Sequence, residues 1–159
     1  MKNINIKNKK NIKTNDINDI EYVKLTRGIL MENDGLFKTL QNLTAAPELS
    51  EDETIDIFDK ISSQDTHIFV AILNSSIVGC ISILIEQKFI HSGGLVGHIE
   101  DVSIRRGFEG RGISRKLINM AIDYANTRDC YKIILDCSFE LERFYEKFAF
   151  KKKGIMMRL

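Results

Sequence analysis

The sequence has no long hydrophobic run, no excess of charge of one sign and no paired cysteines. Its longest apolar stretch, Ile77 to Ile85, covers about half of a bilayer and is too short to cross a membrane. Cys80, Cys130 and Cys137 show neither a C-x-x-C pair nor the spacing of zinc ligands. We therefore expect a soluble, cytoplasmic protein with reduced thiols and no membrane association.

Lysine and arginine number 23 and aspartate and glutamate 22, so the net charge is close to zero. Proteins that bind nucleic acid or an anionic membrane surface usually carry a basic excess, which argues against both partners. Five of the lysines lie in residues 1–13, without an acidic residue, so the rest of the chain is mildly acidic. Residues 1–15 are rich in Asn, Lys and Ile without periodicity, and we interpret them as a flexible tail rather than a functional basic arm.

A length near 150 residues suggests one domain, which we place at residues 16–159. Ser50 and Glu53 have the form of a capping box, and Asn74-Ser75-Ser76 is turn chemistry between two strands. The run Ile133-Ile134-Leu135 is typical of a strand covered on both faces. Hydrophobic periodicity predicts strands over residues 20–25, 67–73, 77–85, 95–104, 131–137 and 151–159, and helices over residues 28–43, about 51–61, 113–126 and 141–148. Their order predicts one α/β domain around a mixed sheet.

Residues 102–114 are the most informative segment, because a predicted strand leads there through a glycine-rich loop directly into a helix. Such a loop aims backbone N–H groups and the positive end of a helix dipole at one point, which suits a pyrophosphate. It is not a P-loop, since no Gly-Lys-Ser/Thr follows, and the G-x-G-x-x-G spacing is absent. The spacing alone fits equally well a tight turn in which Gly107, Gly110 and Gly112 only shape the start of the helix.

Residues 109–114, Glu-Gly-Arg-Gly-Ile-Ser, resemble the pyrophosphate-binding loop of the GNAT superfamily of N-acetyltransferases, whose usual form is Arg/Gln-x-x-Gly-x-Gly/Ala. The resemblance implies the acyl-CoA N-acyltransferase fold, an α/β fold with a central, mixed but mostly antiparallel sheet flanked by helices. Glu109 stands where Arg or Gln is usual, and Ser114 where Gly or Ala is usual. An acidic side chain at Glu109 should repel a diphosphate. The candidates to compensate are Arg105, Arg106 and Arg111.

Three more segments, residues 97–102, 130–137 and 144–147, are similar in order and spacing to the glucosamine-6-phosphate N-acetyltransferases of that superfamily. Residues 88–91 also resemble this family, and the match runs from about residue 77 to the C-terminus. The resemblance implies transfer of the acetyl group of acetyl-CoA, a co-substrate, to the 2-amino group of glucosamine 6-phosphate without a metal. This reaction lies on the route to UDP-N-acetylglucosamine.

The resemblance also implies residue roles. Glu100 is the first candidate to orient the amine or a water that deprotonates it, and Asp136 is a second carboxylate. Because adjacent strand residues point to opposite faces, Glu100 and Asp101 should not do the same job, so one would act through its backbone or across a subunit boundary. Tyr145 is the candidate donor to the leaving thiolate. The alternative to these roles is structural. Glu100 and Asp101 would then be a solvated strand end, and Tyr145 would be a packed core aromatic.

Backbone N–H groups at or just before Ile104 are the expected oxyanion donors. The expected acetyl-CoA contacts are Val102, Ser103, Ile104, Gly110, Arg111, Gly112, Ile113, Ser114 and Tyr145. By the same resemblance Thr44, Lys132 and Arg158 bind the sugar phosphate, with Arg158 coming from the partner in a homodimer with shared active sites. The alternative is that Lys132 and Arg158 are ordinary surface charges.

His67, His91 and His98 lack the spacing of a metal site, and Cys137 is expected to pack, because direct transfer needs no cysteine nucleophile. Two other functions stay open on the sequence alone. One is a GNAT enzyme acting on a different amine, such as a polyamine, another amino sugar or a protein terminus. The other is a non-catalytic acyl-CoA-binding module.

Overall fold

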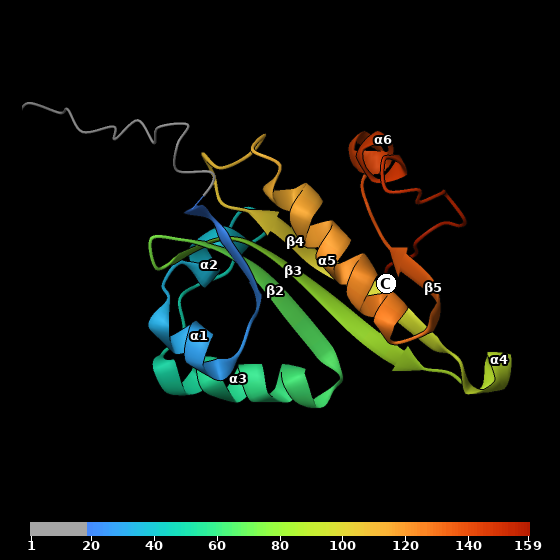
Figure 1. The fold of residues 1–159 in the computed structure, drawn as a ribbon, viewed down its shortest axis with the longest axis horizontal. Coiled ribbons are helices and arrows are strands. Elements are labelled where there is room, and N and C mark those ends of the chain that lie inside the picture. Colours follow the sequence, from blue (N-terminus) through green and yellow to red (C-terminus); the bar gives the residue numbers. More distant parts are fainter. Residues whose placement is uncertain (1–18) are drawn as a thin grey trace, which may run out of the picture.

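Five strands form one sheet in the order in which they occur along the chain, in a computed structural model that describes residues 19–159 (Figure 1). Neighbouring strands from the first to the fourth are antiparallel, and the last two are parallel. The strands are β1 (Glu21–Lys24), β2 (Thr66–Leu73), β3 (Ser76–Gln87), β4 (Leu95–Ile104) and β5 (Cys130–Leu135). The predicted mixed, mostly antiparallel sheet is confirmed, whereas the predicted tail at residues 1–15 lies outside the described residues.

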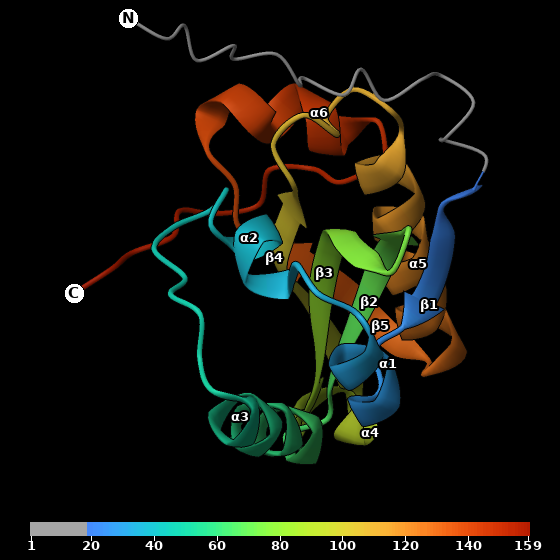
Figure 2. The same ribbon diagram turned by 90° about the vertical axis from the view of Figure 1, so that its left-hand side faces the viewer.

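Helices cover both faces of the sheet, which gives the molecule three layers (Figures 1 and 2). Helix α5 packs on one face with Tyr145, around a cluster that includes Ile81, Ile83 and Leu117. The first three helices pack on the other face, around Leu30, Val70 and Ile77. The helical segments are α1 (Arg27–Glu32), α2 (Leu36–Leu40), α3 (Glu51–Ser63), α4 (Ile90–Gly93), α5 (Ile113–Thr127), a 3-10 turn η2 (Phe139–Leu141) and α6 (Glu142–Glu146). No helix in this described part is long and apolar enough to cross a membrane.

The predicted hairpin of β2 and β3 is confirmed. Its two central turn residues, Asn74 and Ser75, both have positive φ, at 51° and 56°. A two-residue hairpin with positive φ at both central positions matches the right-handed twist of the strands. The local turn chemistry therefore sets the register of β2 against β3.

The helix predicted over residues 28–43 is two short helices instead. Gly35 lies between them in the left-handed region, at φ 85°, where a helix cannot continue. The backbone of Asp34 binds the hairpin, because its N–H donates to Ser75 and its C=O accepts from Ile77. Tertiary pairing therefore overrides the helical period at this point.

Helix α3 has the predicted capping box, in which Ser50 and Glu53 satisfy each other's backbone N–H groups. Its predicted buried face is wrong, however. None of its residues is fully buried, and Ile57 is 42% exposed. The helix therefore lies over the edge of the second cluster and covers it only in part.

Two predictions about the C-terminal part are also wrong. Strand β5 is the edge of the sheet rather than a strand covered on both faces, and Ile134 is 39% exposed. Residues 151–159, expected to form a last strand, pair with no other strand among the described residues and run away from the body of the molecule (Figure 2). A strand needs a partner for its backbone groups, and residues 19–159 offer none here.

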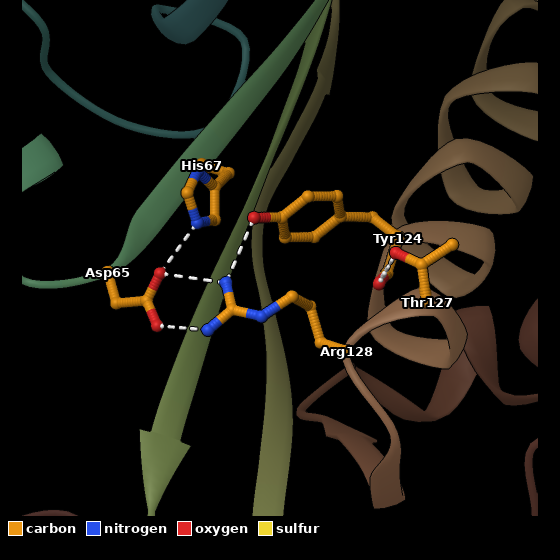
Figure 3. A network of polar contacts seen from close by, with 5 residues as sticks. All are labelled: Asp65, His67, Tyr124, Thr127 and Arg128. Carbon is orange, nitrogen blue, oxygen red and sulfur yellow. Dashed lines mark hydrogen bonds and ion pairs between the residues drawn. The ribbon is translucent and has the colours of Figure 1, made fainter.

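A polar network fastens the end of α5 to the start of β2 (Figure 3). Arg128 donates to both carboxylate oxygens of Asp65, at 3.1 and 2.9 Å, and to the Tyr124 hydroxyl at 3.1 Å. His67 Nε2 lies 2.7 Å from Asp65 Oδ1, and its ring stacks on Tyr124. Arg128 and His67 lower the pKa of Asp65 below its usual value. The network anchors the C-terminal end of the helix whose other end follows the glycine-rich loop.

Candidate active site

The centre of the candidate site is a break in β4. Its parallel pairing with β5 stops at Ile99 opposite Leu135, although β4 continues to Ile104. On the other side, Ser82 pairs with Glu100 and Cys80 with Ser103, so two residues of β4 oppose one residue of β3. Such a β-bulge bends a strand and changes the direction of its side chains. Past Ile99, the backbone groups of β4 on the β5 side have no strand partner.

Asp101 forms the bulge, with φ at 51°. Below it, the buried Cys80 thiol donates weakly to the Asp101 carbonyl at 3.7 Å. Glu100 and Asp101 are consecutive and both exposed. The sequence argument about them assumed a regular strand, in which neighbouring side chains point to opposite faces, and the bulge at Asp101 interrupts that alternation. No period in the sequence marks this bulge, and only the pairing of β4 with β3 reveals it.

Three carboxylates gather where β4 leaves β5. The pKa of Glu100 is raised above its usual value, first by partial burial and then by the negative charges of Asp101 and Asp136. Asp136 directly follows β5, so the break in pairing brings it near Glu100. The structure thus brings together the three acidic residues that the sequence selected, and its raised pKa makes Glu100 a stronger base than an ordinary glutamate.

Tyr145 lies on α6, within the cluster under α5, and is only 7% exposed. Its ring packs against Phe144 and Phe150, at centroid distances of 5.1 and 6.2 Å. Burial raises its pKa, and the neighbouring Cys137 thiol raises it further. Tyr145 is therefore both a core aromatic and a phenol that stays protonated near neutral pH. Cys137 itself is exposed, so the expectation that it packs is wrong.

The glycine-rich loop ends in a helix start that lacks a side-chain cap. Gly112 is the N-cap of α5 at φ 80°, and the first helical hydrogen bond runs from Lys116 to Gly112. The backbone N–H groups of the first turn consequently have no partner within the helix. A Cβ added at Gly107, Gly110 or Gly112 would meet no atom within 4 Å, so there is open space around the loop. The loop fits an anionic group of the size of a pyrophosphate.

The positive charge of Arg105 is not directed at the glycine-rich loop, contrary to the sequence expectation. Its Nη2 donates to Ser76 Oγ at 3.0 Å and to the Ile77 carbonyl at 2.5 Å, beneath Gly35. A side chain on Gly35 would collide with this guanidinium. Arg106 and Arg111 are left as the cations near the loop.

The geometry agrees with comparisons to known proteins. Residues 35–150 match the model of the acetyltransferase (GNAT) family. The chain is 34% identical to glucosamine 6-phosphate N-acetyltransferase 1 of Dictyostelium discoideum, over 79% of this chain and 82% of the relative. This chain belongs to the GNAT acetyltransferase family.

Solved structures support the same membership. A crystal structure of an acetyltransferase of Trypanosoma brucei superposes with a TM-score of 0.83 at 34% identity, covering 89% of this chain and 99% of that one. The glucosamine-6-phosphate N-acetyltransferase of Arabidopsis thaliana gives a TM-score of 0.81 at 32% identity, over 88% and 97% of the two chains. The predicted GNAT fold is thereby confirmed.

Residues of α2 and of the turn that follows it hold β3 and β4 in place, and sequence reasoning missed them. Ser103 donates to the Thr39 carbonyl at 2.6 Å, and the buried Thr39 hydroxyl donates to Ile77 at 2.7 Å. Asn42 Nδ2 donates to the Ile104 carbonyl at 2.9 Å and its oxygen lies 3.4 Å from Arg106 Nε. A threonine or asparagine on a predicted helix gives no signal of such distant partners.

The residues expected at the sugar phosphate are not brought together within one chain. Thr44 follows α2, two residues after the Asn42 that binds the end of β4. Lys132 lies on β5 opposite Val96, which is eight residues before Ile104 on β4, or roughly 25 Å along a strand. Arg158 lies on the exposed C-terminal segment.

The histidines are engaged in other contacts. His98 Nε2 lies 2.8 Å from Glu86 on the neighbouring strand, and His91 stacks on Tyr131. Among residues 19–159 no group of three or more His, Cys, Asp or Glu side chains is arranged to hold a metal ion.

Proposed function

We propose that this protein transfers the acetyl group of acetyl-CoA to the 2-amino group of glucosamine 6-phosphate, which gives N-acetylglucosamine 6-phosphate and CoA. The observation that carries the proposal is the cluster of Glu100, Asp101 and Asp136 where β4 separates from β5. The similarity to glucosamine 6-phosphate N-acetyltransferases over most of their length supports the choice of acceptor. The product would feed the synthesis of UDP-N-acetylglucosamine.

The acceptor amine must lose a proton before or as it attacks the thioester carbonyl. A carboxylate with a raised pKa is suited to this step, because its pKa lies closer to that of the amine or water whose proton it accepts. Glu100 has that property, because burial raises its pKa and the negative charges of Asp101 and Asp136 raise it further. We assign Glu100 to the amine or its water, and the other two carboxylates to the sugar site.

Formation of the new C–N bond breaks the C–S bond of the thioester, and the departing sulfur needs a proton or a hydrogen bond. The raised pKa of Tyr145 keeps its phenol protonated at neutral pH, so it can donate. Backbone N–H groups of β4 beyond Ile99, on the side where the pairing with β5 has ended, are suited to the oxyanion. The uncapped first turn of α5, with Gly110 to Ser114, would hold the pyrophosphate.

We further propose a homodimer with shared active sites. The separation of Thr44 from Lys132 within one chain, and the extended segment that carries Arg158, support a site completed by a second copy. Ile155 and Met157, on the same segment, are each 90% exposed, and β5 offers an open sheet edge. Large exposed apolar side chains beside an open edge favour association. We expect light scattering to give twice the 18.2 kDa mass of the chain, and deletion of residues 155–159 to give a monomer; a monomeric full-length protein would contradict the dimer.

The acceptor is tested by incubating the protein with acetyl-CoA and one amine at a time, while free thiol is followed. The panel contains glucosamine 6-phosphate, glucosamine, a polyamine and a peptide with a free amino terminus. We expect release only with glucosamine 6-phosphate. Release with another amine would replace the acceptor, and acetyl-CoA binding without release for any amine would make the protein a binding module.

A further inference from the structure

The side chain that departs from the family pattern, Glu109, is turned back on its own loop. Its Oε2 accepts from the Gly107 N–H at 2.6 Å. From the other side of the same residue, the Gly107 carbonyl accepts from Arg111 Nη2 at 2.9 Å. Both polar groups of Gly107 are therefore bound by side chains that lie two and four residues further along the chain.

These two contacts stabilise the turn that contains Gly107. The Phe108 N–H donates to the Arg105 carbonyl at 3.0 Å, and Gly107 has φ at 87°, which is the arrangement of a type II turn with glycine at its third position. Gly110 and Gly112 also have positive φ, at 73° and 80°. Three glycines within six residues allow the unliganded loop many conformations. A hydrogen bond that holds the loop in its binding conformation lowers the conformational entropy lost when a ligand binds.

The position of Arg111 adds to the same arrangement. Its guanidinium lies 5.1 Å from the centroid of the Phe108 ring, so it is held by the aromatic face as well as by Gly107. Glu109 and Arg111 thus flank one peptide with opposite charges, and the negative charge of Glu109 is directed at a backbone donor of the turn instead of the uncapped end of α5.

We propose that Glu109 is a positioning residue for acetyl-CoA, which holds the glycine-rich loop in its binding conformation through Gly107. This inference rests on the proposed use of acetyl-CoA. It reverses the expectation from the sequence, in which the carboxylate could only repel the diphosphate. Glutamine, one of the two residues usual at this place in the resembling loops, offers an amide oxygen as acceptor to Gly107 without the charge.

Three variants separate the hydrogen bond from the charge. Glu109→Gln keeps an acceptor and removes the charge, Glu109→Ala removes both, and Glu109→Asp keeps the charge on a side chain one methylene shorter. Binding of CoA is measured by titration calorimetry at low and high salt. Asp123→Asn, which removes one exposed negative charge on α5, serves as the control for net charge.

We expect Glu109→Gln to bind CoA at least as tightly as the wild type, and Glu109→Ala to bind about three- to tenfold more weakly than Glu109→Gln, the range of one hydrogen bond. Glu109→Asp should bind more weakly than the wild type. In hydrogen exchange, the Gly107 amide should be protected in the wild type and in Glu109→Gln and lose protection in Glu109→Ala. In turnover, the KM for acetyl-CoA should rise in Glu109→Ala and the KM for glucosamine 6-phosphate should not.

Equal affinity of the alanine and glutamine variants, both above that of the wild type, would mean that Glu109 only repels the cofactor and would overturn the inference. A wild-type protein that binds no CoA would overturn the proposed function itself. The two failures are distinguishable, because the first appears in the ratio between variants and the second in the wild type alone.

Discussion

Replacing Tyr145 by phenylalanine removes one hydroxyl from the candidate site and leaves the packing of the ring intact. The side chain is 7% exposed and lies edge to face with Phe144 and Phe150, contacts that a phenylalanine keeps. Tyr145→Phe should therefore fold normally, with a melting temperature close to that of the wild type. Any loss of activity then reports on the hydroxyl.

The size of the loss follows from the leaving group. Proton transfer by a positioned side chain contributes about 10²- to 10⁴-fold to a rate. A thiol has a pKa of about 8.5, so its anion is a moderate leaving group and the benefit lies at or below the low end of that range. We expect a fall in kcat of about 10- to 100-fold, which corresponds to roughly 1.4–2.7 kcal/mol of barrier.

The assay follows thiol release at saturating acetyl-CoA and glucosamine 6-phosphate, beside calorimetric binding of CoA to the same preparations. Tyr22→Phe is the matched control, because burial also raises the pKa of Tyr22, which is half-buried but lies on the distant edge strand β1. We expect unchanged CoA affinity in both variants and slow turnover only in Tyr145→Phe. Turnover equal to that of the wild type would remove the Tyr145 hydroxyl from the reaction and leave it a core aromatic.

Three other changes test the remaining parts of the site and the fold. Because Glu100 would act as a deprotonated carboxylate, kcat/KM should fall as pH drops through its raised pKa. Glu100→Gln should remove this acidic limb of the pH profile and lower kcat/KM at least tenfold. An unaltered pH profile would exclude Glu100 as the base. Arg158→Ala should raise the KM for glucosamine 6-phosphate more than that for acetyl-CoA, and equal effects would argue against a phosphate contact. Because the pKa of Asp65 is lowered by Arg128, its stabilisation is present above the usual carboxyl pKa and lost as pH falls through the lowered value. Asp65→Asn should lower the free energy of unfolding in urea by about 1 kcal/mol at pH 7 and by much less in acid. A difference between variant and wild type that stays the same at both pH values would contradict the ion pair.

Much of the fold could be predicted because its signals are local. The hairpin at Asn74 and Ser75, the capping box at Ser50 and the apolar face of α5 depend on residues close in sequence. The errors occur where distant partners decide. Asp34 pairs with the hairpin and divides a predicted helix, and the segment of residues 151–159 finds no strand partner in the part of the chain that the structure describes.

The same division holds for the site. The sequence by itself selected the candidate residues, because the glycine-rich loop at residues 109–114 and the segments around it resemble a known family within short stretches of chain. Only the tertiary structure decided where their side chains go. A bulge of one residue at Asp101 cancels the alternation of side chains, since the period of a strand is two. Arg105 is drawn under Gly35 by the Ile77 carbonyl, and Glu109 turns to Gly107, because a charged side chain takes the donors and acceptors that folding places within its reach.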